Sequence, residues 1–218
     1  MMMKQKIIKQ IENITSSLIK VGLSVEQNFP SSQNGSIYIN GKQDLSIALK
    51  NISYKEIYTV LEKDKNYNIK MIDGALIQFM YLFEEDKLIK YRLAFFPSPS
   101  LEEFQNNSEI YEIDEIYADV IAKNILPVPI RFDYDPKSSI KIEHPSSHLT
   151  IGQYKNCRIP VSLPITPNIF IDFILRNFYN TASNEYQKDL AFDKIILFEN
   201  CIENEEKDLL HISFANAR

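Results

Sequence analysis

Residues 127–158 read PVPIRFDYDPKSSIKIEHPSSHLTIGQYKNCR, and the rest of the chain is interpreted outward from them. Successive side chains of a β-strand point to opposite faces of a sheet. A strand over residues 130–135 would have one apolar and one charged face, made by Ile130, Phe132 and Tyr134 and by Arg131, Asp133 and Asp135, respectively. Pro136 ends this strand, because proline has no N–H to donate to a sheet ladder.

A second strand follows the turn at Pro145. It places His148, Thr150 and Gly152 on one face, and Leu149 and Ile151 on the other. If the two strands are neighbours, His148 meets Asp133 or Asp135 on the polar face. The run therefore predicts a site that combines histidine, carboxylate and arginine side chains.

The flanking sequence predicts helices around further strands. Apolar residues at helical spacing indicate a helix over residues 3–21 that Gly22 ends, and another that begins after Ser53 with Glu56 as its capping-box partner. Residues 67–97 read as consecutive antiparallel strands with turns at Asp73-Gly74 and at residues 84–87. The middle strand is apolar throughout, which indicates a central position covered on both sides.

Further elements complete the predicted fold. An acidic segment predicts a helix over residues 108–124, and Thr166 with Pro167 predicts the start of a buried helix. The tail LLHISF, residues 209–214, reads as an edge strand. We therefore expect a single α+β domain over residues 1–218, in which helices cover an antiparallel β-sheet.

Composition limits the classes of function. The chain has 218 residues, of which 44% are hydrophobic and 24% charged, as is usual for a globular protein. It lacks an apolar run long enough for a membrane span and a secretory h-region, so we expect a cytoplasmic protein with no membrane partner. Its formal net charge of -5 argues against binding nucleic acid by bulk electrostatics, although a local basic groove remains compatible with it.

The polar face admits three interpretations. In the first, carboxylates with His148 hold a divalent metal, Mg²⁺ or Mn²⁺, for phosphodiester hydrolysis. In the second, His144 or His148 is a general acid or base beside arginines that stabilise phosphate charge, as in metal-independent ribonucleases. In the third, the charges form a satisfied network on a surface that docks a partner.

These interpretations assign roles to specific residues. The candidate catalytic residues are Asp133, Asp135, His144 and His148, of which Asp133 and Asp135 are the candidate metal ligands. The candidate nucleic-acid-binding residues are Arg92, Arg131, Tyr154, Lys155 and Arg158. HExxH, Walker A and GxGxxG motifs are absent, and the PD-(D/E)XK signature is not clear, so ATP hydrolysis by this chain alone is not expected.

Three blocks of the chain carry a resemblance to a known family: YRLAFFPSPSLEEFQ (91–105), YADVIAKNILPVPIRFDYDP (117–136) and HPSSHLTIGQYKNCRIPVSLPITPNIFIDFILRNFY (144–179). They closely resemble the domain of unknown function 2290 family, over roughly residues 5–215. Members of that family lie beside a helicase gene in bacterial anti-phage defence operons.

The resemblance implies an accessory or effector subunit of a two-component helicase system, whose partners are the helicase of the same operon and DNA or RNA. It brings no established catalytic residues. A non-enzymatic sensor or adaptor that binds a phage component or regulates the helicase is the competing expectation. A weaker likeness to small toxins of toxin–antitoxin pairs is confined to an Arg-x-Asp strand followed by a histidine-containing strand, and it keeps open a metal-independent ribonuclease-like toxin.

Overall fold

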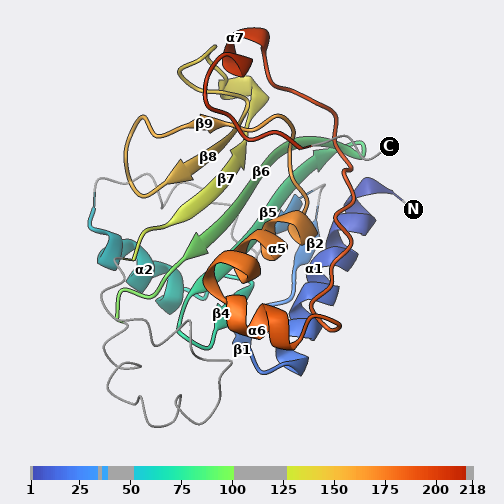
Figure 1. Cartoon of the computed structure of the whole chain (residues 1–218), viewed down its shortest axis with the longest axis vertical. Helices are drawn as coiled ribbons and strands as arrows, with labels where there is room; N and C mark the ends of the chain where they lie inside the picture. The colour runs from blue at the N-terminus through green and yellow to red at the C-terminus, as the bar shows by residue number, and fades with distance from the viewer. Residues whose placement is uncertain (1, 34–35, 39–51, 101–126, 215–218) are drawn as a thin grey trace.

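A computed structural model describes residues 2–33, 36–38, 52–100 and 127–214, and nine strands in these residues form one antiparallel sheet (Figure 1). The strand order is β1-β4-β5-β6-β7-β8-β9, and β3 joins β5 and also pairs with β2. The strands are β1 Ser24–Gln27, β2 Ser31–Gln33, β3 Ser36–Tyr38, β4 Ile69–Met71, β5 Leu76–Glu84, β6 Lys87–Phe96, β7 Ile130–Tyr134, β8 Ser147–Ile151 and β9 Ile159–Pro160.

The hairpin of β5 and β6 is the centre of the sheet. Its turn places Glu85 and Asp86 at φ values of 47° and 66°, and the turn between β4 and β5 places Gly74 at 81°. A two-residue turn with positive φ at both central residues has a backbone twist that matches the right-handed twist of the two strands it joins. Both turns lie where the sequence predicts them, and β5 is buried along most of its length, as its apolar run predicts.

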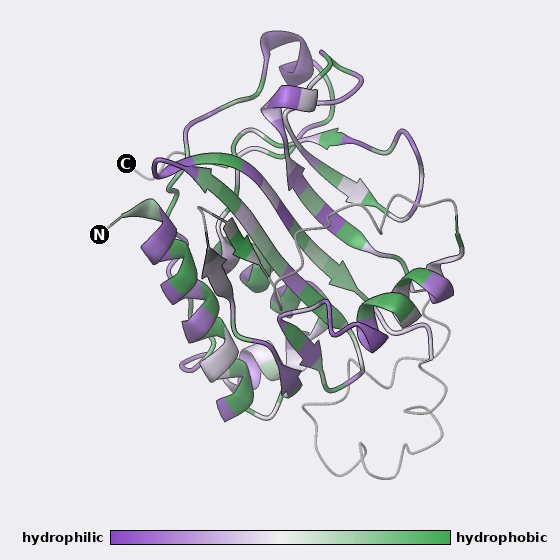
Figure 2. Cartoon of the chain, turned by 180° about the vertical axis from the view of Figure 1, so that it is seen from behind, coloured by the Kyte–Doolittle hydropathy of each residue, from purple (hydrophilic) through white to green (hydrophobic). Residues whose placement is uncertain are grey.

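Helices cover both faces of this sheet unequally. On one face, α1 Met3–Lys20 packs beside α5 Pro167–Phe178 and buries the large hydrophobic core (Figure 1). On the opposite face, α2 Tyr54–Lys63 covers Leu76, Ala94 and Phe96 (Figure 2). The short helices are η3 Pro136–Ser138, α6 Asn180–Glu185 and α7 Asn204–Lys207.

The helix signals in the sequence are confirmed. The Ser53 side chain accepts a hydrogen bond from the Glu56 N–H, and the Glu56 carboxylate accepts one from the Ser53 N–H, which completes the predicted capping box. Thr166 caps α5, and Pro167 is its first residue. The α+β class with one antiparallel sheet is therefore confirmed.

Two other expectations have different outcomes. The helix predicted over residues 108–124 lies outside the described residues. The predicted edge strand over residues 209–214 is wrong, because Ile212 makes only an isolated bridge with Val161. Within the part of the chain that the structure describes, no helix has the length and apolarity needed to cross a membrane.

Candidate functional site

The strand register aligns three of the predicted site residues across the sheet. Arg92 on β6 pairs with Asp133 on β7, and Asp133 pairs with His148 on β8. Arg131 lies two residues before Asp133 and therefore shares its face. The prediction that His148 meets Asp133 is confirmed, and hydrophilic and hydrophobic residues alternate along the strands of the sheet (Figure 2).

Arg92 and Asp133 form a buried ion pair. The Arg92 Nε lies 2.7 Å from Oδ1 of Asp133, and the two side chains are only 8% and 13% exposed. Burial alone would raise the pKa of Asp133, but Arg92 and Arg131 outweigh it and hold this pKa below its usual value. Asp133 is therefore ionised at neutral pH.

Arg131 lacks a comparable partner. It is 5% exposed, and its buried Nη1 has no hydrogen-bond partner among the described residues. Burial lowers the pKa of Arg131; Asp133 raises it, and the cations Arg92 and Arg158 lower it. An arginine remains charged even so, so Arg131 adds a second positive charge that acts on the Asp133 carboxylate.

Two histidines complete the group. The His148 Nδ1 lies 2.8 Å from the Pro145 carbonyl oxygen, and the His144 Nδ1 lies 2.7 Å from that of Ser138. A carbonyl oxygen only accepts, so each Nδ1 donates and the lone pair of the neutral ring is on Nε2. The ring centroids are 4.9 Å apart, which brings the two candidate acid–base groups together.

The pKa of His148 is lowered. Burial is the main cause; Asp133 and the Pro145 carbonyl oppose it, and the electrostatic effects of His144 and Arg158 add to it. His148 is therefore neutral at pH 7, the form in which Nε2 can accept a proton. We call Arg92, Arg131, Asp133, His144, His148 and Arg158 the arginine–histidine cluster.

Asp135 and Asp133 bind different side chains. The Lys90 Nζ lies 2.6 Å from Oδ2 of Asp135, which also accepts a hydrogen bond from Ser138 Oγ at 3.0 Å. Burial alone would raise the pKa of Asp135, but Lys90 and Ser138 lower it. Lys90 is not among the candidate site residues, although its alternation with Arg92 along one strand indicates a polar face there.

The metal interpretation finds no donor set here. No group of three or more His, Cys, Asp or Glu side chains within the described residues is placed to hold a metal ion. Asp133 and Asp135 each bind a different cationic side chain.

The remaining candidates lie in the loop between β8 and β9. Tyr154 is 76% exposed, and Lys155 is exposed as well. Arg158 is half-buried; its Nη1 lies 3.5 Å from the Glu143 carbonyl oxygen, and its charge acts on Arg131 and His148. Arg158 therefore belongs to the cluster, whereas Tyr154 and Lys155 extend from it into solvent.

Fold and site together define an α+β protein that carries a largely buried arginine–histidine cluster on one face of an antiparallel sheet. Residues 23–214 match a family model described as "Uncharacterized conserved protein (DUF2290)". Because this match covers most of the chain, the protein belongs to the DUF2290 family. Neither a search of curated proteins nor a search of solved structures found a match.

Proposed function

We propose that this protein is the effector or accessory subunit of a two-component, helicase-linked anti-phage defence system and that it acts on nucleic acid. In this proposal the arginine–histidine cluster binds a backbone phosphate and cleaves the phosphodiester without a metal. The observation that carries the proposal is the buried Nη1 of Arg131, which lacks a hydrogen-bond acceptor among the described residues.

An unpaired buried donor is costly unless a ligand supplies the acceptor. Among the described residues, Arg131 and Arg158 add positive charge beside the Arg92–Asp133 pair, in a chain whose net charge is -5. A phosphate group would supply both the negative charge and the hydrogen-bond acceptors, because a guanidinium can donate two parallel hydrogen bonds to it. The cluster is therefore better suited to an anion than to a metal.

The two imidazoles supply the acid and the base. In the proposed reaction, the neutral His148 takes the proton of the attacking oxygen at Nε2 as the new P–O bond forms. His144, protonated at Nε2, gives a proton to the leaving oxygen as the old P–O bond breaks. Arg131 and Arg158 stabilise the charge that develops on the phosphate oxygens.

The proposal of a helicase partner rests on the family resemblance. The chain has neither a nucleotide-binding loop nor a net positive charge, so a partner would supply translocation and most of the affinity for nucleic acid. The solvent-exposed Tyr154 and Lys155 lie in the loop that also contains Arg158 and are suited to stacking and phosphate contacts.

The test is a cleavage assay with the full chain, alone and with the helicase encoded beside it. Single- and double-stranded DNA and RNA are incubated in EDTA and, in parallel, in Mg²⁺. We expect a product in EDTA that His148→Ala and His144→Ala each reduce at least about a hundredfold, the usual contribution of a general acid or base. Arg131→Met should lower the affinity for the substrate as well.

His211→Ala is the matched control. His211 is half-buried in the C-terminal segment, and its Nδ1 lies 2.9 Å from the nearby Leu209 carbonyl oxygen. All variants are first compared by circular dichroism and thermal unfolding. Full phage protection by folded His148→Ala and Arg131→Met variants would remove the cluster from the function.

A non-enzymatic sensor or adaptor is the second candidate function. The Arg92–Asp133 and Lys90–Asp135 pairs favour it, because charges that are satisfied within the protein can shape a docking surface without taking part in chemistry. Under this alternative no product forms with any nucleic acid, and Arg131→Met abolishes pull-down of the helicase while His144→Ala does not.

A further inference from the structure

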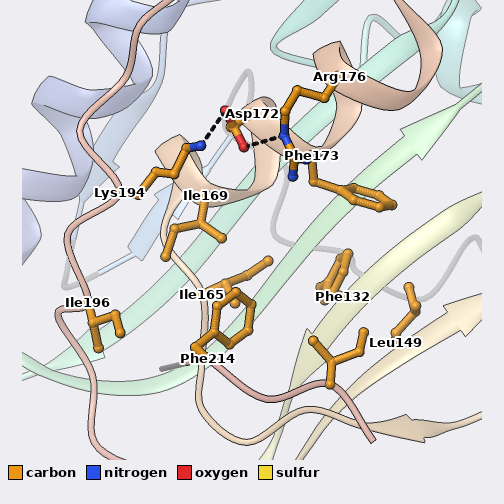
Figure 3. Close-up of a pocket in the computed structure, with 11 residues that line it drawn as sticks. Phe132, Leu149, Ile165, Ile169, Asp172, Phe173, Arg176, Lys194, Ile196 and Phe214 are labelled. Carbon is orange, nitrogen blue, oxygen red and sulfur yellow. Dashed lines mark hydrogen bonds and ion pairs between the residues drawn. The ribbon is translucent and has the colours of Figure 1, made fainter. Parts of the chain in front are cut away.

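A pocket opens on the other face of the strands that carry the cluster. Phe132 of β7 and Leu149 of β8 form one wall, and α5 contributes Ile169 and Phe173 (Figure 3). Ile196 and Phe214 of the C-terminal segment close another side. The volume is about 450 Å³, within the range typical of small-molecule sites.

Three charged residues lie together at one end of this pocket. Asp172 receives Arg176 Nε at Oδ2 and Lys194 Nζ at Oδ1, each at 2.9 Å (Figure 3). The two cations are 58% and 55% exposed, whereas Asp172 is 16% exposed. Since both carboxylate oxygens are already occupied and one positive charge is in excess, this end of the pocket attracts an anion.

Arg176 has donors to offer such an anion. Only its Nε contacts Asp172, and neither Nη has a hydrogen-bond partner within the described residues. Among the residues that the structure describes, the other side chains lining the pocket are uncharged. An apolar chamber with a single cationic end matches a ligand that has an apolar body and one acidic group.

We infer that this pocket binds a small amphipathic acid. The apolar body lies between α5 and the strands β7 and β8, and the carboxylate contacts Lys194 and the Nη atoms of Arg176. This site is separate from the arginine–histidine cluster, because the side chains of Phe132 and Leu149 point away from those of Asp133 and His148. The inference does not depend on the proposed phosphodiester chemistry.

The test measures binding of decanoate to the full chain by calorimetry, below the concentration at which decanoate forms micelles. Decanol and decylamine are the matched probes, since they keep the apolar body and change only the head group. We expect saturable, one-to-one binding of decanoate and at least about fivefold weaker binding of the other two, the upper end of what an exposed ion pair contributes. Lys194→Met should weaken decanoate binding to a similar extent.

Two tryptophan substitutions locate the site. Ile196→Trp places a larger ring at a half-buried lining position and should abolish binding, whereas Ile195→Trp, at the neighbouring 52% exposed position outside the pocket, should leave it unchanged. Absence of binding at millimolar decanoate, equal binding of all three probes, or unchanged binding by Ile196→Trp would each overturn the inference.

Discussion

The two faces of β7 and β8 are held by different kinds of interaction. On one face, Phe132 and Leu149 pack into the hydrophobic core beneath α5. On the other, Asp133 and His148 lie among arginines. Truncation of a buried apolar side chain lowers the free energy of unfolding by an amount that grows with the cavity left behind. Removal of one partner from a buried ion pair lowers it because the other charge remains buried without that partner. Adjacent residues of one strand should therefore respond differently to substitution.

The largest effect is expected on the apolar face, at Phe170 of α5. This residue is fully buried, and its ring lies 6.0 Å from those of both Phe79 and Phe132. Phe170→Ala should lower the free energy of unfolding by about 3 to 5 kcal/mol, because it leaves a cavity between helix and sheet. Urea denaturation followed by circular dichroism measures the change.

The matched control for that substitution is Phe29→Ala, at a residue that is 53% exposed. It should change the free energy of unfolding by no more than about 0.5 kcal/mol. Equal losses in the two variants would contradict the packing of α5 against the sheet.

On the polar face the corresponding change is Asp133→Ala. Removal of this carboxylate leaves Arg92 buried without its ion-pair partner, and the expected loss is about 3 kcal/mol. Asp189→Ala is the control, because its pair with Lys20 has the same 2.7 Å distance but is 69% and 37% exposed. That control should cost less than about 1 kcal/mol.

The double variant Arg92→Met, Asp133→Leu sharpens the contrast between the faces. Replacement of both members by apolar side chains should be less destabilising than Asp133→Ala alone, because Arg92 is no longer buried as a cation without the Asp133 carboxylate, whereas Arg131 is the same in both variants. If the double variant loses as much as the sum of both single variants, the two residues do not stabilise the fold as a pair.

The sequence predicts most of the arrangement that these experiments probe. Side chains alternate between the two faces of a strand, which places Arg131 and Asp133 on one face of β7. The single loop between β7 and β8 brings His148 beside Asp133. The β5–β6 hairpin follows from its turn residues. These features depend on contacts between neighbouring elements, which local patterns describe well.

Other features need the register between distant segments. The Lys90–Asp135 pair depends on how β6 pairs with β7, and the Asp172–Lys194 contact joins a helix to a segment without regular structure. The expected edge strand at the C-terminus also depends on a distant segment: Ile212 pairs with the backbone of Pro160 and Ser162, but the Phe214 N–H donates to the Ser162 side chain, so the pairing ends after one bridge.

A smaller effect is expected in the pH dependence of stability. Burial, opposed by Asp133, holds the pKa of His148 below its usual value, so the unfolded chain binds a proton more readily than the folded protein. The contribution of His148 to stability is complete above the unfolded pKa of about 6.5 and is lost as the pH falls toward the folded pKa.

His148→Gln should therefore reduce the loss of stability of the wild-type protein between neutral and mildly acidic pH. Urea midpoints measured at several pH values provide the comparison, with His211→Gln as the control for a histidine outside the cluster. An identical pH dependence in wild type and His148→Gln would contradict a neutral, buried His148.

The smallest effect is expected at the edge of the polar face, where Lys90 and Asp135 are 36% and 17% exposed. A double-mutant cycle with alanine at both positions should give a coupling energy of about 0.5 to 1 kcal/mol, because water screens a pair that is only partly buried. The cycle on Arg92 and Asp133, which lie two positions further along β6 and β7 and are more buried, should give a larger coupling energy. Equal coupling energies for the two pairs would contradict the expectation that depth of burial sets their strength. The positive charge of Arg131, which also acts on Asp133, would then have to be included in explaining how strongly the Asp133 carboxylate is held.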